Sequence, residues 1–230
     1  MGSALSRNAV LLLILCLLVP LGAAAQSSDM VSAEKFFSNL SASFSAVKDY
    51  EANIAITQGK TVSRGRISYK SPVYLFIRFD DPANQVICFD GEKLTVYLPA
   101  EQVVLQQTYK KKTPAQIEGL VTAQGLSLLQ RNYSIAYLVG PAPVPLDDGS
   151  REMSVKLRLV SRGTSSFSQL VISVEGSTIR RVEGTLASGD KVVMDFTGMR
   201  TNQGVPASRF AYDPPPYANV IQDWLFDPEQ

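Results

Sequence analysis

The sequence predicts a mainly β fold of the α+β class, a strongly curved antiparallel sheet of about ten strands with helices on its concave side. Two observations predict it. Short runs rich in Val, Ile, Tyr and Phe follow one another from Tyr50 onwards, separated by Gly, Pro and Asp turns. Only two segments carry the spacing of an amphipathic helix, one before the strands and one in their middle.

The amino-acid composition limits the classes of function that the chain can have. The 230 residues are 45% hydrophobic and 19% charged, which suits one globular domain with a substantial core. Because 22 Lys and Arg balance 21 Asp and Glu, no basic field is available to attract nucleic acid. The chain has no histidine, which removes the usual general base, the commonest zinc ligand and any Ser-His-Asp triad.

The first 25 residues have the pattern of a secretory signal peptide. Arg7 precedes an apolar run over 10–18, and Ala23–Ala25 offers a cleavage site. We therefore expect a signal peptide over 1–25 and one exported domain over 26–230. Cys16 lies within the apolar run, so we interpret it as an ordinary apolar residue of the signal peptide rather than as a lipidation site. Cys88 is then the only cysteine of the mature chain, and the fold forms without a disulfide.

The expected elements follow in order. A helix with Ser32 as its N-cap carries an apolar stripe of Phe36, Phe37, Leu40, Phe44 and Val47. Strands are expected from Tyr50 and over Thr61–Lys70, Val73–Phe79, Gln85–Phe89, Leu94–Leu98 and Gln102–Gln107.

A second helix is expected to begin at Thr113 and Pro114, where Gln116 completes a capping box. Its apolar side would consist of Ile117, Leu120, Val121 and Leu128. After a Pro-rich loop over 140–150, strands are expected over Met153–Val160, Phe167–Val174, Thr178–Leu186 and Lys191–Met199, with a strand-like Arg209–Tyr212.

The segment Val73–Phe79 is apolar on both faces, apart from Arg78. A strand covered on both sides explains this pattern. Two interpretations remain open on composition: an ordinary packed core, or an apolar cavity for a lipid-like ligand.

The chain has one run of three consecutive basic residues, which consists of Lys110, Lys111 and Lys112 and lies just before the second expected helix. Such a run is either a solvated turn or a docking patch for an acidic partner or for anionic lipid head groups. Three lysines contribute only about 1 kcal/mol each near a charged membrane, which is too little to hold a protein there.

Carboxylates and thiols give little support for catalysis. Asp90-Gly91 between two apolar runs is typical of a hairpin turn, and Asp147-Asp148 lack the ligand spacing of a calcium site. Cys88, between Ile87 and Phe89, is typical of a buried apolar residue. No carboxylate pair is singled out for glycosidase chemistry, so we expect no enzyme, no metal and no cofactor.

Several motifs together resemble the periplasmic outer-membrane lipoprotein carrier family LolA. They are Gly65-x-Ile67-x-Tyr69-Lys70-x-Pro72, Asp90-Gly91-x-x-Leu94-x-x-Tyr97-x-Pro99, Glu101-Gln102-Val103, Asn202-x-x-Val205-Pro206 and Phe210-x-Tyr212-x-Pro214-Pro215. The resemblance covers most of the chain after residue 25.

The resemblance implies an unclosed antiparallel β-barrel of about ten or eleven strands whose concave side, covered by helices, encloses a hydrophobic cavity for acyl chains. Residues expected to line it are Phe44, Ile54, Ile67, Tyr69, Leu75, Ile77 and Phe79, with Ile117, Leu120 and Val121 on the covering helix.

Two positions depart from the family. Some carriers have an arginine before the matched proline, held to tie the covering lid shut, and here this lid-contact position is Ser71. Serine cannot form the bidentate bonds of a guanidinium, so closure would rest on other contacts. Thr95 and Val96 also stand where a tryptophan is common.

The resemblance implies a monomeric periplasmic carrier that takes acylated lipoproteins from an inner-membrane ATP-driven lipoprotein-releasing complex to an outer-membrane acceptor. Acyl chains need such a carrier, since each CH₂ exposed to water costs roughly 0.8 kcal/mol. The alternatives are an exported lipid or glycolipid binding protein and an envelope-stress sensory domain of the same fold.

Overall fold

One large sheet organises the computed structural model, which describes residues 31–109 and 122–224 within one compact unit. The helical elements are α2 (Ala33–Ser45), α3 (Ala123–Asn132) and the short 3₁₀ helix η2 (Ala207–Phe210). The strands are β1 (Asp49–Gln58), β2 (Thr61–Lys70), β3 (Tyr74–Asp81), β4 (Val86–Phe89), β5 (Lys93–Leu98), β6 (Val103–Thr108), β7 (Tyr133–Tyr137), β8 (Val144–Pro145), β9 (Met153–Ser161), β10 (Phe167–Glu175), β11 (Thr178–Leu186), β12 (Lys191–Thr201) and β13 (Asn219–Gln222).

The strand order is β13-β6-β5-β4-β3-β2-β1-β12-β11-β10-β9-β7, with β8 paired to β9. The sheet is unclosed, because β13 and β7 lie at its two ends and do not pair. This confirms a mainly β fold with an open antiparallel sheet, although the described residues form 13 strands rather than ten or eleven. One pair also departs from the antiparallel pattern, since β13 runs parallel to β6.

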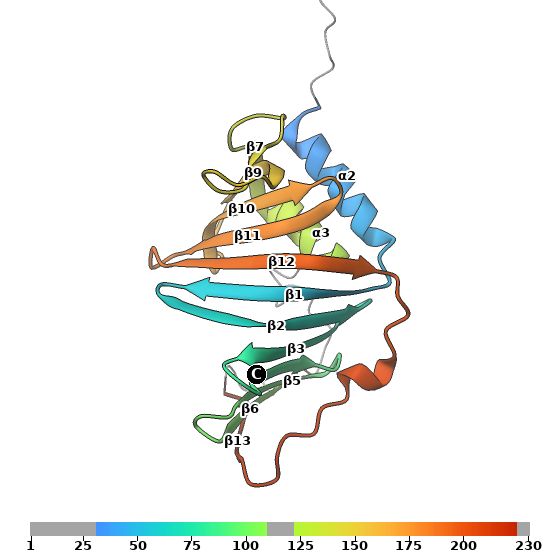
Figure 1. Ribbon diagram of the computed structural model, residues 1–230, viewed down its shortest axis with the longest axis vertical. Coiled ribbons are helices and arrows are strands. Elements are labelled where there is room, and N and C mark those ends of the chain that lie inside the picture. The colour runs from blue at the N-terminus through green and yellow to red at the C-terminus, as the bar shows by residue number, and fades with distance from the viewer. Residues whose placement is uncertain (1–30, 110–121, 225–230) are drawn as a thin grey trace, which may run out of the picture. The chain divides into compact units, whose positions relative to one another are not determined.

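Both α-helices lie on one face of the sheet, which we call the inner face (Figure 1). Ser32 caps α2 as predicted, and its Oγ accepts a hydrogen bond from the Lys35 amide at 3.2 Å. Phe37, Leu40 and Phe44 are buried, because residues three and four apart share one side of a helix. They pack with Leu126 and Leu129 of α3 and with inward side chains of β1–β3, β7 and β9–β12, and we call this cluster the inner core.

The opposite, outer face of β3–β6 carries a second cluster, the outer core. It contains Phe76, Val86, Cys88, Tyr97 and Val104 from the strands, covered by Val205, Phe210 and Ala218 from the chain after β12. The rings of Phe76 and Tyr212 lie 6.1 Å apart. Strand β3 is therefore covered on both faces, as the two-sided apolar pattern of Val73–Phe79 predicted.

The strand predictions were wrong in four places. Arg209–Tyr212 does not form a strand, because η2 occupies most of it and the Arg209 amide donates to the Pro206 carbonyl at 3.1 Å. Strands β7 and β13 were missed, as was the short β8 inside the Pro-rich loop. The predicted second helix is seen only as α3, which Thr122 caps, since residues 113–121 lie outside the described residues.

Candidate functional site

The predicted cavity-lining residues within the described chain all lie in the inner core. Each is 5% exposed or less: Phe44, Ile54, Ile67, Tyr69, Leu75, Ile77 and Phe79. Phe44 belongs to α2, and the alternation of side chains along β1, β2 and β3 places the other six on the face that carries the helices.

Two groups of predicted site residues lie outside the described residues. One is the apolar side of the expected covering helix, and the other is the basic run proposed as a docking patch. They are Ile117, Leu120 and Val121 in the first group, and Lys110, Lys111 and Lys112 in the second. Both predictions therefore stay predictions, and the site is built below from other residues.

Strand register continues the apolar surface beyond the predicted set. Ile67 pairs with Ile77, Ile77 with Ile87, Ile87 with Val96, and Val96 with Leu105, which makes one row across β2–β6. Ile67 and Ile77 are buried, whereas the other three are half-buried. The row therefore runs from the inner core to an apolar surface on β4–β6 that remains accessible.

A second row runs beside the first, because side chains two residues apart share a face. It joins Tyr69, Leu75, Phe89 and Leu94, of which Phe89 and Leu94 are half-buried. Among the described elements, the main contacts of α2 and α3 are with each other and with β7. We call the half-buried residues Ile87, Phe89, Leu94, Val96 and Leu105 the open strip. Sequence reasoning missed them, although the alternation within 86–89, 93–98 and 103–108 carried the signal.

Two tyrosines bring polar groups into this apolar environment. The Tyr69 hydroxyl donates to the Pro72 carbonyl at 3.1 Å, whereas the Tyr50 hydroxyl is fully buried and has no hydrogen-bond partner among the described residues. Burial raises the pKa of both phenols above the usual value. Both groups are therefore neutral at physiological pH and can only donate or accept hydrogen bonds.

The sequence analysis also considered Asp90, Cys88 and Ser71, and the structure shows the contacts of each. Asp90 Oδ1 accepts from the amides of Glu92 and Lys93, and Gly91 has φ of +97°, so Asp90-Gly91 forms the predicted turn. Cys88 is buried as predicted, and burial raises the pKa of its thiol to about 11. Ser71 is exposed, and its amide donates to the Lys48 carbonyl at 2.7 Å.

The carboxylate of the loop residue Asp147 forms an ion pair with an arginine side chain. Arg181 Nη1 donates to Asp147 Oδ1 at 2.6 Å, and Arg181 Nε donates to Asp195 Oδ1 at 2.8 Å. Within 31–109 and 122–224, no group of three or more acidic or cysteine side chains is placed to hold a metal ion. The open strip is therefore an apolar and partly accessible surface.

The described helices are all too short or too polar to cross a lipid bilayer.

Comparison with known proteins identifies relatives. Residues 37–213 match the family model described as outer membrane lipoprotein carrier protein LolA. A protein of Pseudomonas fluorescens named outer-membrane lipoprotein carrier protein is 26% identical over 160 residues, which are 69% of this chain and 72% of that protein.

Two solved structures share the fold. An uncharacterized conserved protein from Thermus thermophilus superposes with a TM-score of 0.52 at 11% identity, over 82% of this chain and 98% of that chain. The complex of MucA and MucB from Pseudomonas aeruginosa gives a TM-score of 0.50 at 13% identity, over 82% of this chain and 63% of that chain. At such identities, these similarities concern the fold alone.

Proposed function

Because the chain belongs to the LolA family, whose model spans residues 37–213, we propose that it is a periplasmic carrier of acylated lipoproteins. Its acyl-binding surface is the inner face of β2–β6, which comprises the predicted residues of β2 and β3 and the open strip. The observation that carries the proposal is the row from Ile67 to Leu105, where a buried apolar core becomes an accessible apolar surface.

The physical role of this surface is to replace water around acyl chains. Each CH₂ removed from water contributes roughly 0.8 kcal/mol, so a free acyl chain does not leave a membrane unaided. Side chains such as Val96 and Leu105 keep part of their apolar surface available for a ligand. A carrier of this kind requires no catalytic group.

In this proposal, residues 1–25 are a cleaved signal peptide and residues 26–230 are the exported carrier. An inner-membrane ATP-driven complex loads the lipoprotein, and an outer-membrane acceptor receives it. Because Ser71 replaces the arginine of some carriers, its exposed hydroxyl takes no part in a bidentate lock, and retention of cargo depends on apolar contact.

The similarity to the MucA and MucB complex supports the sensory domain as a second candidate function, since this fold also occurs in a complex of two proteins. A sensory protein of the same fold would bind a protein partner and would not transfer lipoproteins. An exported lipid or glycolipid binding protein is the other alternative. Identification of the bound molecule distinguishes all three.

The test is to purify the exported protein from the periplasm without detergent and to identify bound molecules by native and denaturing mass spectrometry. We expect acylated lipoproteins in a one-to-one complex. Recovery of free phospholipid or glycolipid alone would favour the general lipid binder. Retention of a periplasmic protein without acyl groups would favour the sensor.

Glutamate variants locate the bound molecule. Leu105→Glu places a charge on the half-buried inner face, where we expect loss of lipoprotein binding. Val160→Glu is the matched control, because Val160 lies on β9 with 42% of its surface exposed and shares the face of the exposed Arg158. Half-buried positions are preferable to Leu75 or Ile77, where a buried glutamate would unfold the protein.

A further inference from the structure

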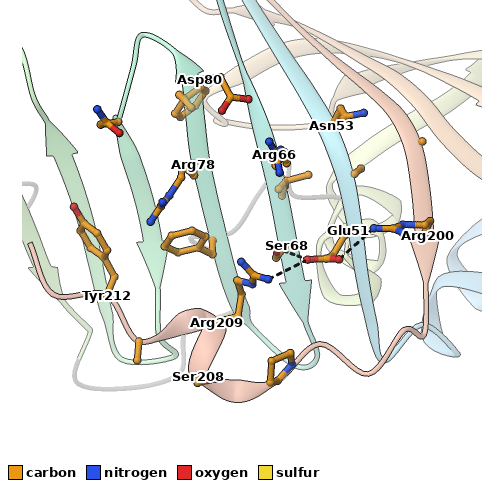
Figure 2. A pocket seen from close by; sticks show the side chains of 18 of the residues that line it. Glu51, Asn53, Arg66, Ser68, Arg78, Asp80, Arg200, Ser208, Arg209 and Tyr212 are labelled. Carbon is orange, nitrogen blue, oxygen red and sulfur yellow. Dashed lines mark hydrogen bonds and ion pairs between the residues drawn. The ribbon is translucent and has the colours of Figure 1, made fainter.

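A hollow on the outer face, away from the inner core, gathers arginine side chains. Its volume is about 1090 Å³, and it is lined by residues of β12, β1, β2 and β3 and by residues 206–212. Figure 2 shows four arginines from separate elements along it: Arg66, Arg78, Arg200 and Arg209. Glu51 and Asp80 are the only acidic residues in its described lining, so positive charge is in excess.

The arginines fall into two pairs with different surroundings. Arg200 and Arg209 share Glu51, at 3.5 and 3.9 Å, and Glu51 also accepts a hydrogen bond from Ser68 at 3.1 Å (Figure 2). Arg66 and Arg78 are exposed, and within 31–109 and 122–224 neither has an ion pair or a side-chain hydrogen bond. The guanidinium N–H groups of Arg66 and Arg78 are therefore available to donate hydrogen bonds to a ligand.

Strand register makes this second pair unusual. Arg66 on β2 lies directly opposite Arg78 on β3, so two positive side chains stand on neighbouring strands and on the same face. Like charges in this relation destabilise a sheet. The Arg78 guanidinium lies 5.8 Å from the centre of the Phe76 ring, which orients it without neutralising its charge.

We propose that this hollow binds an acidic peptide segment of a partner protein, with Arg66 and Arg78 as its main carboxylate-binding residues. The inference goes beyond the carrier function, because the hollow and the inner core lie on opposite faces of the sheet. Arginine suits the role, since its planar guanidinium binds carboxylates through two parallel hydrogen bonds.

The spread of charge favours a peptide over a single phosphate group. Arg200, Arg66 and Arg78 lie on strands from β12 to β3, which span roughly 14 Å at the usual spacing between neighbouring strands. An extended peptide covers that distance with about four residues. Phe76 and Tyr212 provide an aromatic wall for an apolar side chain between acidic ones. A planar lipid surface would not enter a hollow bounded by residues 206–212.

The test measures binding of a hexaglutamate peptide carrying an uncharged fluorophore, by fluorescence anisotropy at 150 mM NaCl. We expect the double variant Arg66→Gln and Arg78→Gln to bind at least tenfold more weakly than wild type. The matched control is Arg151→Gln with Arg158→Gln, which removes the same charge from exposed positions outside the hollow. It should bind within twofold of wild type.

Each other outcome overturns the proposal. Equal weakening in both double variants would show non-specific charge attraction, and absence of peptide binding would exclude the site. Stronger competition by inorganic phosphate, or by phosphatidylglycerol vesicles, would assign the arginines to phosphate or lipid instead.

Thermal unfolding of the Arg66 and Arg78 variant should occur at or above the wild-type temperature. Its lipoprotein content should also be unchanged, which separates this test from that of the carrier function.

Discussion

The phenol ring of Tyr50 packs against that of Tyr69, with ring centroids 5.1 Å apart, but in the described part of the chain only Tyr69 has a hydrogen-bond partner for its hydroxyl. A buried hydroxyl without a partner loses its hydration and gains nothing in return. The two tyrosines therefore differ in what their hydroxyls contribute to stability, although both rings fill the inner core.

Replacement of Tyr50 by phenylalanine should raise the free energy of unfolding by about 1 kcal/mol, because it removes an unsatisfied polar group and keeps the ring. Tyr69→Phe is the control and should lower it by about 1 kcal/mol, because it removes the bond to Pro72. Urea denaturation measures both. A loss of stability in Tyr50→Phe would show that the hydroxyl is hydrogen-bonded in solution.

The thiol of Cys88 reports whether the chain after β12 stays on the outer core. Cys88 is 3% exposed, and its Sγ donates to the Phe210 carbonyl oxygen at 3.3 Å. With its pKa raised to about 11 by burial, only about one thiol in a thousand is ionised at pH 8. Alkylation by iodoacetamide at pH 8 should therefore be much slower than in urea. Phe210→Ala should accelerate it, and fast alkylation of the wild type would contradict the covered arrangement.

The ion pairs of Arg181 should make stability depend on pH in the acidic range. Hydrogen bonding from Arg181 holds the pKa of the Asp147 carboxyl below its usual value. The contribution is therefore present above about pH 4 and is lost as pH falls through the lowered pKa. Because 59% of the Asp147 side chain is exposed, Asp147→Asn should cost only about 0.5 kcal/mol at pH 7.

The difference between Asp147→Asn and wild type should disappear near pH 2, when both side chains are neutral, and should shrink in high salt. Asp195→Asn is the comparison, because Asp195 is 22% exposed and accepts from both Arg180 and Arg181. It should cost more, about 2 kcal/mol. Thermal unfolding across pH measures both effects, and a constant difference down to pH 2 would exclude the ionic explanation.

Gly65 allows β2 and β3 to approach closely. A Cβ at this position would overlap the Arg78 carbonyl oxygen and lie 2.7 Å from the Phe79 Cα, beside a register shift in the pairing. Backbone atoms cannot rotate away, so Gly65→Ala should lower the free energy of unfolding by about 2 kcal/mol. Gly163→Ala is the control, since nothing lies within 4 Å of its added Cβ. Equal stability of the two variants would contradict the close contact.

The local pattern predicted most strands because alternation and turn residues lie within the segments themselves. Thr61–Lys70 and Thr178–Leu186 have the bounds that the pattern predicted. By contrast, β13 forms by parallel pairing with β6, more than a hundred residues earlier, and such pairing leaves no local signal. The conformation of Arg209–Tyr212, which forms η2 and extended chain, likewise depends on the packing of Phe210 in the outer core.

The candidate site was predicted in part for the same reason. Side-chain parity within β3 placed Leu75, Ile77 and Phe79 on one face, but the row that joins Ile77 to Val96 requires the register of three strands. The opposition of Arg66 and Arg78 also depends on register and could not be read from the sequence.

The most direct test of the carrier account is photo-crosslinking of a tri-acylated lipopeptide to benzoylphenylalanine at Val96 or at Val160. Val96 belongs to the open strip, and Val160 is an exposed apolar residue on the other face. The account predicts crosslinking to the acyl chains at Val96 and none above background at Val160. Equal crosslinking at both positions, or crosslinking at Val160 alone, would contradict binding of acyl chains on the inner face.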